Sequence, residues 1–434
     1  MSQDFRCDDK ELERRKLLRL EMKRKREKQQ RIALGTVALV VILLLVLLIR
    51  GCAAKNRERA EQAEREAAAA AVRAEASTIT ANLAAVGDLM CYSEQISDAL
   101  KPDGTYDFSE SFKAVAPYLQ AADLTVGNLE LNFCGPDAGY DGRPVFRAPE
   151  SLAATLKDVG FDILQTANTY SIQNGLNGLT STYRYVTEQG MQPLGTYYSK
   201  EAKTKDSGVV MKNVNGIKIA FFAYTKGMNS MTLPEDADYC VDVLYKDYNS
   251  NFEQINKEAL TESINAAKRL NADVIVAMLH WGSEYETEPS KSQQEIADFL
   301  FQNGVDVILG SHSHVVGPME RKTVTVDGKD KEVFVAYSLG NFFSAMTNES
   351  TQESCVLNLE FVMDAETGET SLGEIGYMPV YMLDKGENAA SPRYEILPIR
   401  SALDSSLFEE QTDTFRAAIE HLKQNTVSTL DSGK

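Results

Sequence analysis

The chain has 434 residues, a formal net charge of −18 and 43% hydrophobic residues. This length accommodates a membrane anchor together with one large domain or two small ones. So acidic a chain argues against nucleic acid, and against an anionic membrane face, as the main partner of the large domain, but it is compatible with binding divalent cations.

Residues 32–49 form the uninterrupted apolar run IALGTVALVVILLLVLLI. A helix of this length spans roughly 27 Å at ~1.5 Å per residue, close to the hydrocarbon thickness of a bilayer. Arg31 and Arg50 flank the run, which disfavours a buried core helix. A cleaved signal peptide is also disfavoured, because no A-x-A site follows and the leader is too long. The pattern therefore predicts one transmembrane helix.

The segments on either side of this run differ in charge. Residues 1–31 carry 12 Lys/Arg and 7 Asp/Glu. The positive-inside rule then predicts that this segment is cytoplasmic and that the C-terminal part is extracellular at the cell membrane. Residues 50–79 are rich in Ala, Glu and Arg, with Glu–Arg pairs at helical spacing, and predict a solvated helical stalk. A short coiled coil is the alternative, but apolar heptads are missing.

Six cysteines are present, without CxxC or zinc-finger spacing. Cys7 precedes the apolar run and is expected to stay reduced. The other five face an oxidising side under this topology, which is compatible with a disulfide, although none is predicted.

From about residue 80, buried strand patterns alternate with helical ones, which predicts βαβ units, a mostly parallel sheet covered by helices, and one domain over residues 80–400. The predicted strands lie in 81–90, 122–130, 161–168, 217–225, 272–282 and 305–314, and the helices in Pro149–Val159, Leu176–Gln189, Phe252–Leu270 and Lys291–Gln302. After residue 320 the pattern becomes antiparallel, with a turn at Asp327-Gly328 and a strand pair Cys355–Met363 and Glu374–Leu383. Residues 401–434 form the tail, with a helix near Ser405–Lys423.

The predicted core strands end in residues that can ligate a metal. These residues are Asp88, Glu130, Asn168, His280, His312 and His314. In open α/β sheets, ligands bind beyond the carboxyl ends of strands, so six such donors predict a site for one or two ions of the Zn, Mn or Fe type. Singly, Asp88 could cap a helix, His280 could be a satisfied core histidine, and an HxH pair on one strand face is a weak signal. Their combination favours the metal site.

The sequence also resembles a known family over about residues 81–345. The motifs that carry the resemblance are GDLM (87–90), GNLE (127–130), HWGSEYETEPSKSQQEIADFL (280–300), GVDVILGSHSHVVGP (304–318) and YSLGNF (337–342). They resemble the CapA family, which comprises capsule or poly-γ-glutamate biosynthesis proteins with a calcineurin-like metallophosphatase fold. The resemblance implies an α/β/β/α sandwich with a dinuclear metal centre at its edge. It also implies that the ligands are Asp88, Glu130, His280, His312 and His314, with Asn168 matching the first Asn of a third motif. Glu284 and Asn341 match motif positions without an assigned role.

One motif departs from the family pattern, which usually reads Ala-Asn-Asn-His-Ser-x-Asp. Here Thr169 replaces an amide, Tyr170 replaces a histidine expected to aid the transition state, and Gln173 replaces a carboxylate. Tyr170 is left as the candidate catalytic hydrogen-bond donor, although a phenol with a pKa near ~10 is a poor proton shuttle at neutral pH.

Three functions remain open at this stage. The first is a metal-dependent hydrolase of capsule biosynthesis that uses two divalent ions. The second is a tethered accessory protein that binds an anionic polymer or a capsule synthase complex without turnover. The third is a wall-associated phosphoesterase unrelated to capsule, because a fold does not fix a substrate.

Overall fold

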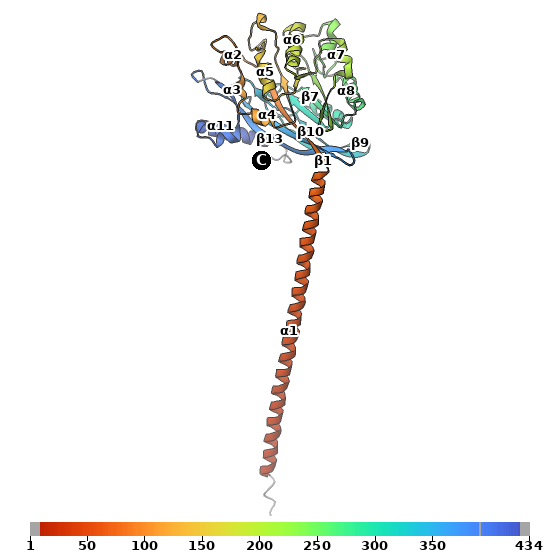
Figure 1. Cartoon of the computed structure of the whole chain (residues 1–434), viewed down its shortest axis with the longest axis vertical. Coiled ribbons are helices and arrows are strands. Elements are labelled where there is room, and N and C mark those ends of the chain that lie inside the picture. The colour runs from red at the N-terminus through yellow and green to blue at the C-terminus, as the bar shows by residue number, and fades with distance from the viewer. Residues whose placement is uncertain (1–8, 390–391, 426–434) are drawn as a thin grey trace, which may run out of the picture. The chain divides into compact units, whose positions relative to one another are not determined.

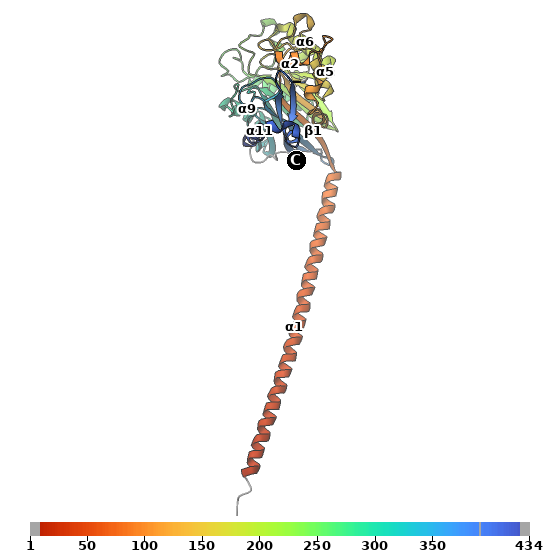
Figure 2. The ribbon, with the colours of Figure 1, turned by 90° about the vertical axis from the view of Figure 1, so that its left-hand side faces the viewer.

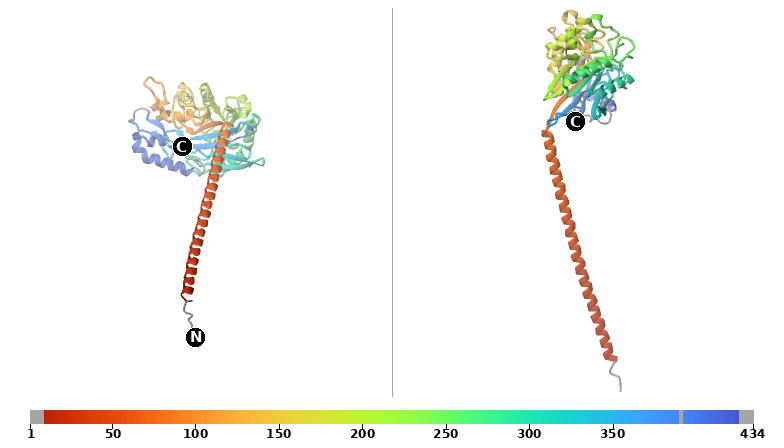
Figure 3. Two further views of the ribbon diagram at one scale, coloured as in Figure 1. Left: turned by 60° about the horizontal axis from the view of Figure 1, so that its bottom comes forward. Right: turned by 90° about the vertical axis from the view of Figure 1, so that its right-hand side faces the viewer.

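The computed structural model describes residues 9–389 and 392–425. The chain divides into two compact units, Met1–Ser77 and Thr78–Lys434. In the first unit α1 (Asp9–Ala76) is one continuous helix (Figure 3). Within it, Glu13–Arg65 contains the one helical stretch in the described part of the chain that is long and apolar enough to cross a membrane. The helix is thus compatible with a single-pass anchor, and its orientation stays a prediction.

The second unit contains two β-sheets (Figure 1). The eight-stranded sheet has the order β14 (Tyr394–Pro398), β13 (Thr370–Asp384), β12 (Glu353–Asp364), β1 (Thr78–Leu89), β2 (Leu124–Leu129), β3 (Ile163–Gln165), β4 (Gln192–Leu194), with β11 (Asn341–Phe343) paired to β1. The six-stranded sheet has the order β5 (Val210–Val214), β6 (Ile217–Thr225), β7 (Val274–His280), β8 (Val307–Ser311), β10 (Lys329–Ala336), β9 (Met319–Val326). In the first sheet the pairs from β1 to β4 are parallel and those from β14 to β1 are antiparallel. In the second sheet the three central pairs are parallel and the two edge pairs are antiparallel.

Helices and short turns connect these strands. The helices are α2 (Ser93–Ala99), α3 (Ser109–Phe112), α4 (Ala116–Gln120), α5 (Ser151–Asp158), α6 (Gly175–Glu188), α7 (Lys200–Thr204), α8 (Lys257–Arg269), α9 (Lys291–Gln302), α10 (Ile399–Leu403) and α11 (Thr412–Asn425). The 3₁₀ turns are η1 (Pro136–Ala138), η2 (Lys205–Gly208), η3 (Glu235–Cys240) and η4 (Ser406–Gln411).

Three apolar cores separate four layers. One core lies between the first sheet and helices such as α5, where Leu129 packs with Leu152. A second lies between the two sheets, and a third lies between the second sheet and helices α8 and α9. Neighbouring residues of β6 show the alternation, because Phe221 belongs to the inter-sheet core and Phe222 to the helix-covered one. Figure 2 shows α5 and α9 on opposite sides of the strands. The α/β/β/α sandwich is confirmed.

The prediction of a single mostly parallel sheet was wrong in one respect. Two mixed sheets pack face to face, and a strand buried on both sides reads as the same apolar run whether a helix or a second sheet covers it. The antiparallel pair of β12 with β13 and the hairpin of β9 with β10 are confirmed. The tail helix α11 begins at Thr412, later than predicted, because a 3₁₀ turn precedes it. Residues 426–434 of the predicted tail lie outside the described residues.

The cysteines whose side chains the structure describes are all free. Cys91, Cys240 and Cys355 are buried and Cys134 is half-buried, with no disulfide among them. Cys7 lies outside the described residues.

Candidate metal centre

The predicted ligands lie at the carboxyl ends of strands from both sheets. Asp88 belongs to β1 and Glu130 follows β2 directly, whereas His280 is the last residue of β7. His312 and His314 come just after β8. All five are buried, the most exposed being His312 at 8%. Parallel strand ends of two packed sheets therefore deliver carboxylates and imidazoles to one edge of the sandwich.

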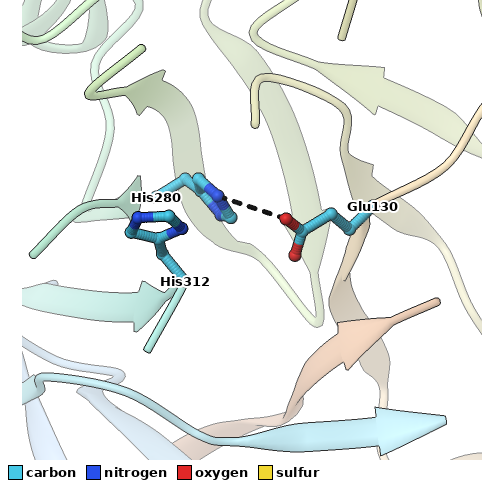
Figure 4. Close-up of side chains that lie close together, drawn as sticks. All are labelled: Glu130, His280 and His312. Carbon is cyan, nitrogen blue, oxygen red and sulfur yellow. Dashed lines mark ion pairs between the residues drawn. The ribbon is translucent and has the colours of Figure 1, made fainter. Parts of the chain in front are cut away.

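These side chains form two groups that share a carboxylate. The ligand atoms of Glu130, His280 and His312 lie within 4.8 Å of one another, and so do those of Asp88, Glu130 and His314. Figure 4 shows the His280 ring facing the Glu130 carboxylate, with His312 beside His280; His280 Nε2 lies 3.5 Å from Glu130 Oε1. Glu130 is therefore the one residue that belongs to both groups.

The arrangement fits divalent metal ions. Glu130 Oε1 is buried and accepts no hydrogen bond from the described residues. An unpaired carboxylate oxygen away from water is costly unless a cation compensates it. Imidazole together with carboxylate is the donor set that Zn, Mn and Fe share. The chemistry of the side chains thus agrees with the predicted cofactor.

The electrostatics of the first group favour neutral imidazoles. Burial, followed by the neighbouring imidazoles, lowers the pKa of His280 well below its usual value. Burial, followed by Lys226, lowers the pKa of His312 to about 3. Both rings are therefore neutral at physiological pH, which is the form that binds metal. Burial and then the charge of Asp88 raise the pKa of Glu130.

His314 behaves differently from the other two imidazoles. Burial lowers its pKa, but the hydrogen bond to Asp88 and the charge of Glu130 outweigh burial and raise it to about 9. Nδ1 of His314 lies 3.1 Å from Asp88 Oδ2 and 3.0 Å from Asn341 Oδ1. A protonated His314 offsets part of the carboxylate charge in the metal-free protein.

The two neighbouring histidines do not lie on a strand face as predicted. β8 ends at Ser311, and His312 and His314 have φ values of 99° and 61°. This left-handed backbone is strained for residues other than glycine and is concentrated at functional sites. The chain turns sharply after the strand, so alternation along the strand no longer decides where the rings point.

Asn128 is a central site residue that the sequence reasoning did not single out. Its Nδ2 donates to Asp88 Oδ1 over 2.8 Å and lies 3.3 Å from His280 Nδ1. The alternation of side chains along β2 puts Asn128 on the same face as Glu130, and this signal could have found it. Asn341 holds His314, which gives its motif position a structural role.

Comparison with known proteins places the chain in a family. The model of the family described as bacterial capsule synthesis protein PGA_cap matches residues 82–346. The chain belongs to this family. That finding confirms the CapA resemblance, and it covers the whole stretch from β1 to just past β11.

Two curated relatives of this capsule synthesis family come from Bacillus. The PGA biosynthesis protein CapA of Bacillus subtilis (strain 168) is 27% identical over 286 residues, which is 63% of this chain and 65% of that protein. The capsule biosynthesis protein CapA of Bacillus anthracis is 28% identical over 283 residues, 63% of this chain and 62% of that protein. The chain thus matches slightly less than two thirds of the length of each relative.

The solved structures to which this chain shows similarity include two nucleotidases. The NAD nucleotidase of Haemophilus influenzae has a TM-score of 0.38 at 15% identity, covering 82% of this chain and 65% of that one. The 5′-nucleotidase precursor of Thermus thermophilus has a TM-score of 0.38 at 14% identity, covering 80% of this chain and 60% of that one. The α/β/β/α arrangement of this family member follows from its own sheet order and layers.

The third motif of this family member lies beside the first ligand group. Thr169 Oγ1 is 2.8 Å from His280 Nε2 and 3.4 Å from His312 Nδ1. Its hydroxyl thus occupies the space between the two imidazoles. The amide of Asn168 instead donates to Asn128 Oδ1 and Leu129 O, over 3.0 and 2.7 Å. Asn168 stays a predicted ligand, and its amide nitrogen is already hydrogen-bonded to residues of β2.

Tyr170 and Gln173 are the other two replaced residues of the third motif. Burial and then Glu130 raise the pKa of the half-buried Tyr170, which keeps its phenol protonated at neutral pH. The ring packs edge-on against Phe146, with centroids 4.7 Å apart. The side chain of Gln173 accepts a hydrogen bond from Asn229 Nδ2 over 3.2 Å. Tyr170 can therefore donate a hydrogen bond but cannot act as a base.

Proposed function

We propose that this chain is a membrane-anchored protein of poly-γ-glutamate capsule assembly whose extracellular domain is a dinuclear metal-dependent hydrolase. The observation that carries the proposal is the sharing of Glu130 by two ligand groups, each with ligand atoms within 4.8 Å. Membership of the capsule synthesis family supports the setting. The apolar part of α1 supports the anchor, and the basic residues before it support the orientation.

The proposed chemistry divides between the two groups. Metal ions held in this way would supply an activated water and would neutralise charge on a phosphoryl or acyl oxygen. Glu130, His280 and His312 would hold one ion, and Asp88, Glu130 and His314 the other. The side-chain amide of Asn128 contacts both Asp88 and His280. Hydrogen bonds of this kind to metal ligands commonly fix the orientation of the ligands. Tyr170 donates a hydrogen bond to the reacting group.

Metal stoichiometry tests this proposal directly. The full chain, purified in detergent and loaded with Mn²⁺, is expected to hold about two ions, and His312→Ala about one, because each group needs its own imidazoles. Metal content is measured by elemental analysis after dialysis. His421→Ala is the matched control, since that imidazole, on α11, lies 3.2 Å from Glu353 and outside both groups. Equal metal content in wild type and His312→Ala would contradict the proposal.

The accessory-protein alternative rests on the replaced third motif. If the chain hydrolyses substrate, Tyr170→Phe should lower kcat about 100-fold with metal content unchanged, because one transition-state donor is lost. Phosphodiesterase and γ-glutamyl hydrolase assays measure this. The accessory role would be favoured if the wild type binds metal without hydrolytic activity and the Tyr170→His variant is active. In that case the histidine supplies the proton shuttle that this chain lacks.

A further inference from the structure

A rim of polar side chains lies beside the metal centre and is not used by the proposed chemistry, apart from the one tyrosine that donates to the reacting group. We define this rim as Arg143, Tyr92, Tyr170 and Tyr285. The Tyr285 ring centroid lies 6.1 Å from that of His314. Tyr92 and Tyr170 both pack edge-on against Phe146, at 5.1 and 4.7 Å. Separate loops therefore contribute to one rim.

Arg143 is carried by a tightly held turn. The amides of Val145 and Phe146 donate to Gly142 O over 3.0 and 2.7 Å. Gly142 N donates to Ser93 Oγ over 3.0 Å, directly beside Tyr92. Asn174 Nδ2 donates to Val145 O over 2.8 Å. Because the turn is fixed from three sides, the exposed Arg143 is held three residues before Phe146, the ring on which Tyr92 and Tyr170 pack.

Most polar groups of the rim lack protein partners. Arg143 forms no ion pair with the carboxylates of residues 9–389 and 392–425. The hydroxyls of Tyr170 and Tyr285 likewise make no hydrogen bond within the part of the chain that the structure describes. Burial raises the pKa of each of the three rim tyrosines, and the charge of Arg143 opposes that rise in all of them. Among the described residues, Arg143 is thus a cation without an ion-pair partner, in the turn whose Phe146 ring contacts Tyr92 and Tyr170.

We propose that the rim binds an anionic oxygen group of the substrate, with Arg143 as the cation that holds it beside the metal centre. This inference rests on the proposed function and names the substrate class as anionic. A guanidinium fork and phenolic donors suit carboxylate or phosphate oxygens. With a net charge of −18 the chain as a whole repels polyanions, so a local cation is needed where such a chain approaches.

Glu284 is the group that could give Arg143 a different role. It is exposed and directly precedes Tyr285, and its charge raises the pKa of the same three tyrosines. If Arg143 served to pair with Glu284, removing either charge would have the same effect. If Arg143 binds an anion, removing Arg143 weakens the binding, whereas Glu284→Gln strengthens it by removing repulsion.

The test measures binding of two probes to the Mn²⁺-loaded full chain in detergent by calorimetry. The probes are inorganic phosphate and a γ-linked glutamate oligomer, which separate phosphoryl from carboxylate recognition. Arg143→Ala is expected to weaken at least one probe by about 10-fold or more, Arg143→Lys less, and Glu284→Gln to tighten it. Arg184→Ala is the matched control, because that exposed arginine pairs with Glu188 on α6.

The outcomes separate this inference from the proposed function. Two results would overturn the inference in variants that hold the normal amount of metal. One is unchanged affinity of Arg143→Ala for both probes, and the other is equal weakening in Arg143→Ala and Glu284→Gln. A wild type that binds neither probe overturns it as well. Failure of the wild type to hold Mn²⁺ contradicts the proposed function instead.

Discussion

Glu130→Gln is expected to abolish the binding of both metal ions. The carboxylate belongs to both ligand groups, whereas each histidine belongs to one. Changes to residues that only support a ligand already cost about 10–100-fold in metal affinity, so loss of a shared ligand should cost more than about 100-fold for each ion. Elemental analysis and Mn²⁺ titration calorimetry of the full chain measure the loss.

Thermal unfolding distinguishes this loss from misfolding. Glu130 is buried beside Asp88, and its Oε1 has no hydrogen-bond partner among the described residues. A neutral amide of the same shape removes the cost of burying a carboxylate beside Asp88, so metal-free Glu130→Gln should unfold at or above the wild-type temperature in EDTA. The rise in Tm that Mn²⁺ gives the wild type should disappear. Glu353→Gln, which changes a largely buried carboxylate outside both groups, should keep that rise. Retention of two ions by Glu130→Gln would refute the shared-ligand geometry.

Local sequence signals predicted much of the fold because each of them has a local cause. The helix Lys291–Gln302 has the predicted bounds, since Ser290 caps it and exchanges hydrogen bonds with Gln293. Strand β7 reads as a run of buried apolar residues, and His280 interrupts the run at the end of the strand. A metal-binding residue at the end of such a strand lies at the edge of the sheet. The ends of the predicted strands therefore indicated which residues would lie close together.

Other features depend on contacts that no local pattern contains. Strand β1 pairs with β12 in a register that places Ala81 opposite Phe361, and alternation within either strand does not specify that partner. The second sheet replaces a helical cover without changing the apolar pattern of β6. The positions of His312 and His314 depend on the left-handed turn after β8, which has no glycine at either residue to reveal it. The donor set could therefore be predicted, and its exact directions could not.

Gly87→Ala is expected to damage both the fold and the second ligand group. A Cβ at this position would lie 1.8 Å from the carbonyl oxygen and 2.8 Å from the carbonyl carbon of Gly340. The same carbonyl accepts the backbone hydrogen bond of Asp88 over 2.8 Å. Because the obstacle is backbone, relief requires β1 and β11 to separate, and the cost should reach about 3 kcal/mol. Denaturant unfolding measures it.

The same displacement should reach the metal centre. Asp88 and Asn341 are paired across these strands, and both contact His314. Gly87→Ala should therefore lose the ion held by Asp88 and His314 before the one held by His280 and His312. Gly317→Ala is the matched control, since its nearest obstacle lies 3.2 Å away, and it should destabilise far less. A Gly87→Ala protein with two ions and wild-type stability would show that the approach of β1 to the Gly340 carbonyl does not position Asp88.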